Sequence, residues 1–188
     1  MHHTVRTDLR CQRIGVRSVR VRERFLTTLQ CMNMIMISLH FRDHLEDWHC
    51  HAEMEFTVAS RDLWRCGLNE KRYRIGAGEG IFINSGVLHM YRVLGKCEDS
   101  ESISIVFLPQ FLSGGTENLI FRKFIEPVME DARMRGEPLR RTGGWQEELL
   151  VCLRRIYCLS REDGWLTEMT LRNQLSQAWE IFIRNCAR

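Results

Sequence analysis

The sequence predicts a mainly β fold that is followed by α-helices at the carboxy-terminal end. Up to about Pro109, short runs rich in Val, Ile, Phe and Met alternate with turn residues, which is typical of β-strands. After Ser113-Gly114-Gly115, apolar residues recur at three- and four-residue spacing, which is typical of amphipathic helices. We therefore expect a β-sandwich or small barrel in residues 1–112 and a helical segment in residues 113–188.

The expected strands lie between turn signals. The clearest hairpin joins residues 63–66 to residues 71–75 through Gly67-Leu68-Asn69-Glu70. The other strands are expected at residues 32–39, 49–59, 80–83, 88–94 and 102–108.

Three helices are expected, at residues 119–135, 145–159 and 166–186. Pro127 lies inside the first and should kink it or split it in two. The other two would form a helical hairpin that covers one face of the β unit or pairs with a second subunit. We assign to a homodimer interface the apolar stripe of the last helix, Leu171, Leu175, Trp179 and Phe182.

Composition is that of an ordinary globular protein. The 188 residues are 44% hydrophobic and 27% charged, which fits one domain or a domain with an appended helical piece. The formal net charge is only +3, but seven arginines between Arg6 and Arg24 make residues 1–28 a basic arm or strand. The eight cysteines contain no Cys-x-x-Cys pair, which argues against a zinc knuckle. Without an export signal or a bilayer-length apolar run, we expect a cytoplasmic protein with no membrane partner.

The most informative segment is His49-Cys50-His51-Ala52-Glu53-Met54-Glu55, which is followed at a distance by His89. On one strand, His49, His51 and Glu55 would project from a single face, and a second strand could bring His89 opposite them. This set suits Zn, Fe, Ni or Mn, and it could instead bind a small polar ligand through hydrogen bonds. Inside a barrel, a ligand, a metal or a hydrogen-bond network would have to compensate the buried charge.

Two further features of these strands support a buried site. Met54, Phe56 and Val58 form an apolar row on the face opposite the acidic side chains, so they should pack against another layer. Tyr91 shares a face with His89, which makes its phenol a candidate hydrogen-bond donor to a bound ligand.

The two motifs together resemble those of cupins. The chain reads HCHAEME at residues 49–55 and GEGIFINSGVLHMY at residues 78–91. More narrowly, this resembles the amino-terminal sensor domain of AraC-type transcription regulators, whose motifs are HWHEEIE-like and GDLLFINPNVPHSY-like. The resemblance spans roughly residues 30–186. Ser85 and Leu88 stand where the family has proline, so the turn before His89 should be less rigid.

The resemblance implies a cupin barrel that binds a small-molecule effector near His49, His51, Glu55, His89 and Tyr91. It also implies that the helical segment forms a homodimer and that DNA is bound only through a separate downstream helix-turn-helix domain. The alternative is a stand-alone metal-dependent cupin enzyme, an oxygenase or isomerase, in which the histidines and Glu55 would hold the metal. No further acid, base or nucleophile can be assigned beside them, and the helical segment favours the sensor.

Overall fold

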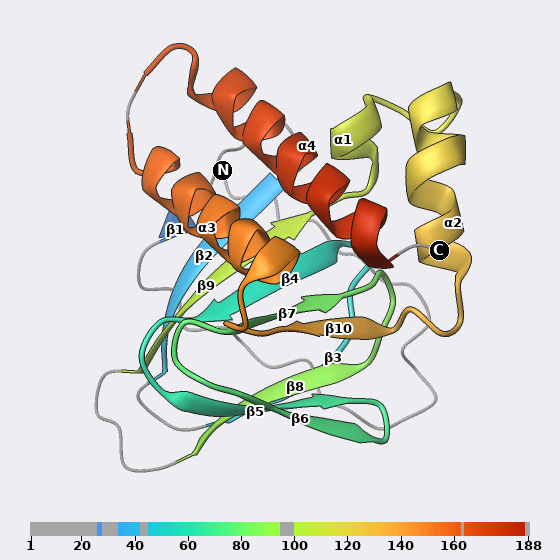
Figure 1. Cartoon of the computed structure of the whole chain (residues 1–188). Helices are drawn as coiled ribbons and strands as arrows, with labels where there is room; N and C mark the ends of the chain where they lie inside the picture. The colour runs from blue at the N-terminus through green and yellow to red at the C-terminus, as the bar shows by residue number, and fades with distance from the viewer. Residues whose placement is uncertain (1–25, 28–33, 42–44, 95–99, 163, 187–188) are drawn as a thin grey trace, which may run out of the picture.

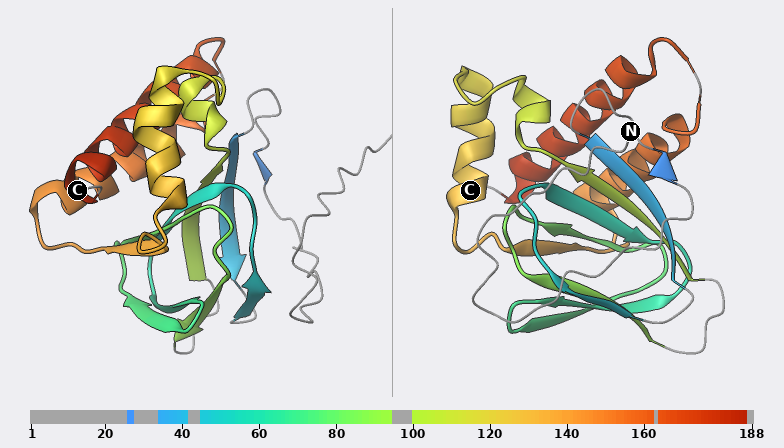
Figure 2. Two further views of the ribbon diagram at one scale, coloured as in Figure 1. Left: turned by 90° about the vertical axis from the view of Figure 1, so that its right-hand side faces the viewer. Right: turned by 180° about the vertical axis from the view of Figure 1, so that it is seen from behind.

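The computed structural model describes residues 26–27, 34–41, 45–94, 100–162 and 164–186. Its β part consists of two antiparallel sheets that face each other (Figures 1 and 2). The larger sheet contains, in spatial order, β1 (Leu26–Thr27), β2 (Met34–Phe41), β9 (Ser100–Phe107), β4 (Met54–Ala59), β7 (Gly80–Ile83) and β10 (Gly136–Leu139). The smaller sheet contains β3 (Leu45–His49), β8 (His89–Leu94), β5 (Leu63–Leu68) and β6 (Lys71–Ile75).

The inner faces of the sheets enclose one of two hydrophobic cores. Because side chains alternate along a strand, Ile81 and Ile83 of β7 point inward, whereas Phe82 points outward to the helical layer. Trp64 and Tyr91 of the smaller sheet meet edge to face in this inner core, with ring centroids 6.0 Å apart. The predicted mainly β fold, built from two packed antiparallel sheets, is confirmed.

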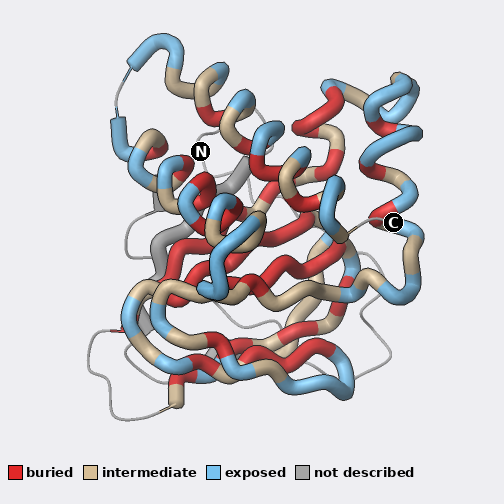
Figure 3. The backbone as a smooth tube through the Cα atoms, in the orientation of Figure 1, coloured by how far each residue is buried: buried red, intermediate tan, exposed pale blue. Residues whose placement is uncertain are grey.

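Helices cover the outer face of the larger sheet (Figure 1). They are α1 (Gln110–Ser113), the π-helix η1 (Phe121–Ile125), α2 (Glu126–Glu130), α3 (Gly144–Leu159) and α4 (Thr167–Cys186). As expected, Met54, Phe56 and Val58 of β4 face this layer, and all three are buried. Figure 3 shows that the strands beneath the helices are mostly buried. Phe56 contacts Phe182 of α4 edge to face, with ring centroids 5.6 Å apart.

The stripe that we assigned to a dimer interface lies inside the chain. Leu171, Leu175 and Phe182 are 0% exposed and Trp179 is 4% exposed, because α4 presents them to the sheet and to α3. Trp179 also donates its indole N–H to the carbonyl oxygen of Phe124. The prediction that these four residues form an intersubunit surface is therefore wrong: they hold the helical layer on the barrel.

Three predicted elements differ from the structure. The single strand expected at residues 49–59 is two strands, β3 and β4, which belong to different sheets. The helix expected at residues 119–135 is divided into η1 and α2 beside Pro127, as anticipated, but it ends at Glu130. The segment after it returns to the larger sheet as β10, which pairs with β7, so residues 113–188 are not purely helical.

The amino-terminal arm and the absence of a membrane span were also predicted from the sequence. The basic arm predicted at residues 1–28 lies outside the described residues, except for the two residues of β1. Among the described residues, no helix is both long and apolar enough to cross a bilayer.

Candidate metal centre between the two sheets

The histidines and Glu55 converge because the chain crosses from one sheet to the other between them. His49 ends β3 in the smaller sheet, His51 lies in the crossing segment, and Glu55 is the second residue of β4 in the larger sheet. His89 begins β8 and pairs directly with His49. The residues therefore do meet between the sheets, but the predicted reason, a shared face of one strand, is wrong.

The three imidazoles form a compact group. The candidate ligand nitrogens of His49, His51 and His89 all lie within 4.8 Å of one another. The ring centroids of His49 and His89 are 4.1 Å apart, and those of His51 and His89 are 5.1 Å apart in an edge-on arrangement. His89 is fully buried, whereas His49 and His51 are half-buried, so the group is reached from solvent past the latter two.

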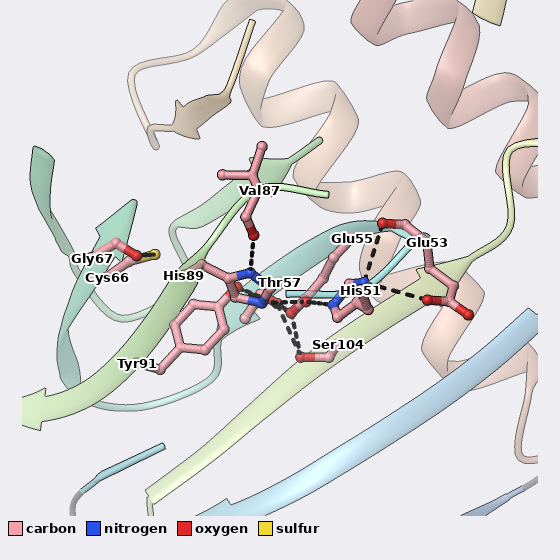
Figure 4. Close-up of polar contacts among 10 residues, drawn as sticks. All are labelled: His51, Glu53, Glu55, Thr57, Cys66, Gly67, Val87, His89, Tyr91 and Ser104. Atoms are coloured by element: carbon pink, nitrogen blue, oxygen red, sulfur yellow. Dashed lines mark hydrogen bonds and ion pairs between the residues drawn. The ribbon is translucent and has the colours of Figure 1, made fainter. Parts of the chain in front are cut away.

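Backbone contacts fix which nitrogen of His89 and His51 is available. Nδ1 of His89 lies 2.8 Å from the carbonyl oxygen of Val87, and Nδ1 of His51 lies 3.2 Å from that of Glu53 (Figure 4). A carbonyl oxygen only accepts, so both Nδ1 atoms carry hydrogen. In the neutral rings, both Nε2 atoms then present lone pairs, which is the arrangement that metal-binding histidines adopt.

The two Nε2 atoms face the same oxygen of Glu55. Oε2 of Glu55 lies 3.3 Å from Nε2 of His51 and 3.4 Å from Nε2 of His89. Three lone-pair atoms that face one another in a buried place require a cation, either a proton or a metal ion. Metal–ligand bonds of about 2.0–2.1 Å place neighbouring tetrahedral ligands roughly 3.3 Å apart, which matches the separation of Oε2 from each of the two nitrogens.

Glu55 is an ionised carboxylate in this environment. Burial by itself would raise its pKa, but hydrogen bonds to His51 and His89 and the charge of the two rings outweigh burial and hold the pKa well below its usual value. The side chain is 4% exposed, and the nearest cationic partners among the described residues are these histidines. This buried anion is therefore balanced either by a proton on the imidazoles or by a divalent cation that takes the place of that proton.

The second oxygen of Glu55 is surrounded by hydroxyl groups. Oε1 accepts from the phenol of Tyr91 at 3.0 Å, from Oγ of Ser104 at 3.3 Å and from Oγ1 of Thr57. All three donors are 3% exposed. The phenol of Tyr91, which we expected to donate to a bound ligand, is thus directed to Glu55 in the structure.

Sequence reasoning missed Thr57 and Ser104. Thr57 was within reach of the alternation argument, because it follows Glu55 by two residues on β4 and so shares its face. Ser104 was not, because its place opposite Thr57 depends on the register between β4 and β9, which the sequence does not reveal.

A tight turn after β7 connects the site to the helical layer. On one side, the hydroxyl of Ser85 donates to the carbonyl oxygen of Ala52 at 2.7 Å, and the N–H of Gly86 donates to that of His51 at 2.8 Å. On the other side, the amide of Asn84 donates to the carbonyl oxygens of Val128 in α2 and Met134, at 2.7 and 2.8 Å. The His51 segment and the region after α2 are therefore bonded to the same three-residue turn.

Among curated protein sequences, the chain is similar to a transcription regulator. No family model matches the chain. It is 24% identical over 137 residues to the uncharacterized HTH-type transcriptional regulator YdeC of Bacillus subtilis, a match that includes 73% of this chain. The chain spans 46% of the length of that regulator.

Solved structures with a similar arrangement are more distant. Oxalate decarboxylase OxdC of Bacillus subtilis is 18% identical, with a TM-score of 0.37 over 41% of this chain and 22% of the decarboxylase. The conserved protein SPY1581 of Streptococcus pyogenes, of unknown function, is 15% identical, with a TM-score of 0.38 over 43% of this chain and 68% of its own. The chain thus has a sequence similarity to a transcription regulator over most of its length.

Proposed function

We propose that this chain is the effector-sensing part of an AraC-type transcription regulator and that a divalent metal ion is part of its effector site. His49, His51, His89 and Glu55 would hold the ion. The observation that carries the proposal is the close approach of Nε2 of His51 and of His89 to Oε2 of the buried Glu55, at 3.3 and 3.4 Å, in a chain that is similar to an HTH-type regulator. A buried carboxylate lowers the stability of the fold unless a bound cation or ligand compensates its charge.

The bound metal would supply positive charge and open positions for a donor atom of the effector. The half-buried His51 and Glu53 form the solvent side of the group, so an effector would approach there. The chemistry favours a small molecule with a carboxylate or another oxygen donor. Zn, Fe, Ni and Mn all suit nitrogen-rich ligand sets of this kind.

A signal from the site would pass through the turn formed by Asn84, Ser85 and Gly86. Any movement of the His51 segment acts on this turn through the hydrogen bonds that Ser85 and Gly86 donate to it. Asn84, in the same turn, is hydrogen-bonded to Val128 and Met134. An effector shifts such an equilibrium only through different affinity for the two arrangements. The DNA-binding part, a cytoplasmic location and a homodimer belong to the proposal for the whole regulator, and the dimer would use surfaces other than the buried stripe on α4.

A ligand screen on the metal-loaded chain tests the sensing function. A library of small carboxylates and polyols would be added to protein loaded with Mn, Zn or Fe(II), and the melting temperature and the concentration of each compound would both be measured. We expect at least one compound to raise the melting temperature of the wild type while the concentration of that compound stays constant. At 100 times its Kd it adds about 2.7 kcal/mol, or roughly 5–10 °C for a domain of this size.

The control for this screen is Glu55→Gln, which keeps the shape of the side chain but removes its charge. The stabilisation should disappear in this variant. Equal stabilisation of wild type and variant would place the effector elsewhere and contradict the proposal.

The second candidate is a metal-dependent cupin enzyme, an oxygenase or isomerase. The histidine group favours it, because three imidazoles, with Glu55 beside two of them, leave positions open at a bound metal. Consumption of a compound in the screen, with stoichiometric redox metal in the protein, would establish the enzyme and reject the sensor.

A further inference from the structure

The hydroxyl groups around Oε1 of Glu55 come from both sheets. Thr57 and Ser104 are directly opposite each other on β4 and β9 of the larger sheet, and their hydroxyl oxygens are 3.0 Å apart. Tyr91 reaches across from β8 of the smaller sheet, and its hydroxyl lies 3.0 Å from Oε1 and 3.1 Å from Oγ1 of Thr57. Glu55 is therefore held from two independent walls of the barrel (Figure 4).

Each hydroxyl carries one hydrogen, and all three lie within hydrogen-bond distance of the charged Oε1 of Glu55. Hydrogen bonds to an ionised acceptor are stronger than those between neutral groups, so the three hydrogens are directed to Oε1. The lone pairs of this oxygen are then occupied. Oε2 is the oxygen that remains, and it faces Nε2 of His51 and His89.

We infer that Thr57, Tyr91 and Ser104 are positioning residues that restrict Glu55 to a single metal-binding oxygen. The inference rests on the metal site proposed above. By holding Oε1, the three hydroxyls prevent the carboxylate from rotating and from chelating the ion through both oxygens. A single carboxylate oxygen among imidazole nitrogens favours small transition-metal ions, whereas Ca²⁺ prefers six to eight oxygens and commonly takes both from one carboxylate.

Cobalt(II) titration of conservative variants tests this role. Tyr91→Phe keeps the ring contacts with Trp64 and His89, and Thr57→Val keeps the side-chain volume, so both should retain the fold. Each variant should bind Co(II) about 10- to 100-fold more weakly than the wild type, as is typical when partners of metal ligands are removed. Their visible spectra should weaken in intensity, because a carboxylate that chelates through both oxygens raises the coordination number.

Two controls separate positioning from general destabilisation. Thr57→Ser retains the hydroxyl and should restore the affinity and the spectrum. Ser176→Ala removes an exposed hydroxyl on α4 that donates to the carbonyl oxygen of Arg172 in the same helix, and it should change neither the affinity nor the spectrum.

The outcomes distinguish this inference from the proposed metal site. If the wild type binds Co(II) while Tyr91→Phe and Thr57→Val match its affinity and spectrum, the positioning role is wrong and the metal site stands. If the folded wild type binds no Co(II), the metal site fails, and the positioning role fails with it.

Discussion

Glu55 has two carboxylate oxygens with different surroundings, and this difference is the main chemical feature of the molecule. Oε1 meets hydroxyl donors, whereas Oε2 meets two imidazole nitrogens whose hydrogens point away to backbone carbonyls. An acceptor that faced donors on both sides would only need a hydrogen-bond network. An acceptor that faces lone pairs needs a cation, either a proton or a metal ion, and the third imidazole of His49 beside the group is why we favour the metal ion.

A second carboxylate, that of Glu79, stabilises the fold through two polar contacts. It accepts a hydrogen bond from the N–H of Gly76 at 2.8 Å and pairs with Arg140 at 2.7 Å, which links the turn before β7 to the residue after β10. Partial burial would raise the pKa of Glu79, but these two partners outweigh burial and lower it. A group whose pKa is depressed by folding stabilises the protein above its unfolded pKa and loses that effect as the pH falls through the folded value.

Glu79→Gln should therefore lower the free energy of unfolding near neutral pH by about 0.5–1 kcal/mol, because the pair is partly exposed. The difference from wild type should shrink as the pH falls below about 4.5, the ordinary pKa range of glutamate. Urea unfolding between pH 7 and pH 3 measures it, with the exposed Glu148→Gln as control. A difference that grows toward acid pH would contradict this assignment.

At the scale of elements, the turn formed by Asn84, Ser85 and Gly86 connects parts that are distant in sequence. The side chain of Asn84 donates to the carbonyl oxygens of Val128 in α2 and of Met134 after it, and it also accepts from the N–H of Ser85 at 2.8 Å. The residue is 3% exposed, so water cannot replace these bonds if the amide is removed.

Asn84→Ala is expected to cost about 2–3 kcal/mol, since it leaves buried carbonyl groups without a donor. Chemical denaturation followed by circular dichroism measures the loss. Asn185→Ala serves as the matched control, because Asn185 makes one exposed bond to its own helix, to Ile181. Equal stability of the two variants would show that the Asn84 contacts do not hold α2 and the residues after it to the sheet.

The elements also show what the sequence could and could not predict. Helices α3 and α4 and strand β7 were predicted nearly to the residue, because strong periodicity and clear turn residues bound them. The change of sheet between His49 and Glu55 was not predicted, because it depends on where a chain of continuous strand character bends. Strand β10 was not predicted either: it contains Gly136 and Pro138 and lies at the edge of the sheet, where such residues are tolerated.

For the molecule as a whole, α4 is the element whose position in the structure differs most from the role that the sequence predicted for it. Its apolar stripe suggested a partner subunit, and periodicity alone cannot tell a second subunit from the chain's own sheet. The structure buries the stripe against β4, β7, β9 and α3, in one core with Phe56, Phe82 and Phe107. The helical layer and the barrel are thus a single packed unit.

Leu175→Glu is consequently expected to unfold the protein rather than produce folded monomers. A charge at a position that is 0% exposed should cost more than about 4 kcal/mol. Circular dichroism and sedimentation would be measured together, with Leu119→Glu, at a 71% exposed position, as control. A well-folded Leu175→Glu variant that differs from the wild type only in its number of subunits would contradict this expectation and would support an intersubunit interface at Leu175.

Metal content is the most direct test of the central claim that the barrel holds a divalent ion. Wild-type protein and His89→Gln would be purified without chelator, dialysed against dilute Mn, Fe(II), Ni or Zn, and analysed by mass spectrometry for bound metal. We expect about one equivalent per wild-type chain with at least one of these metals. The His89→Gln variant should remain folded and hold almost none. Folded wild type that retains no more metal than His89→Gln under any of these conditions would contradict the claim.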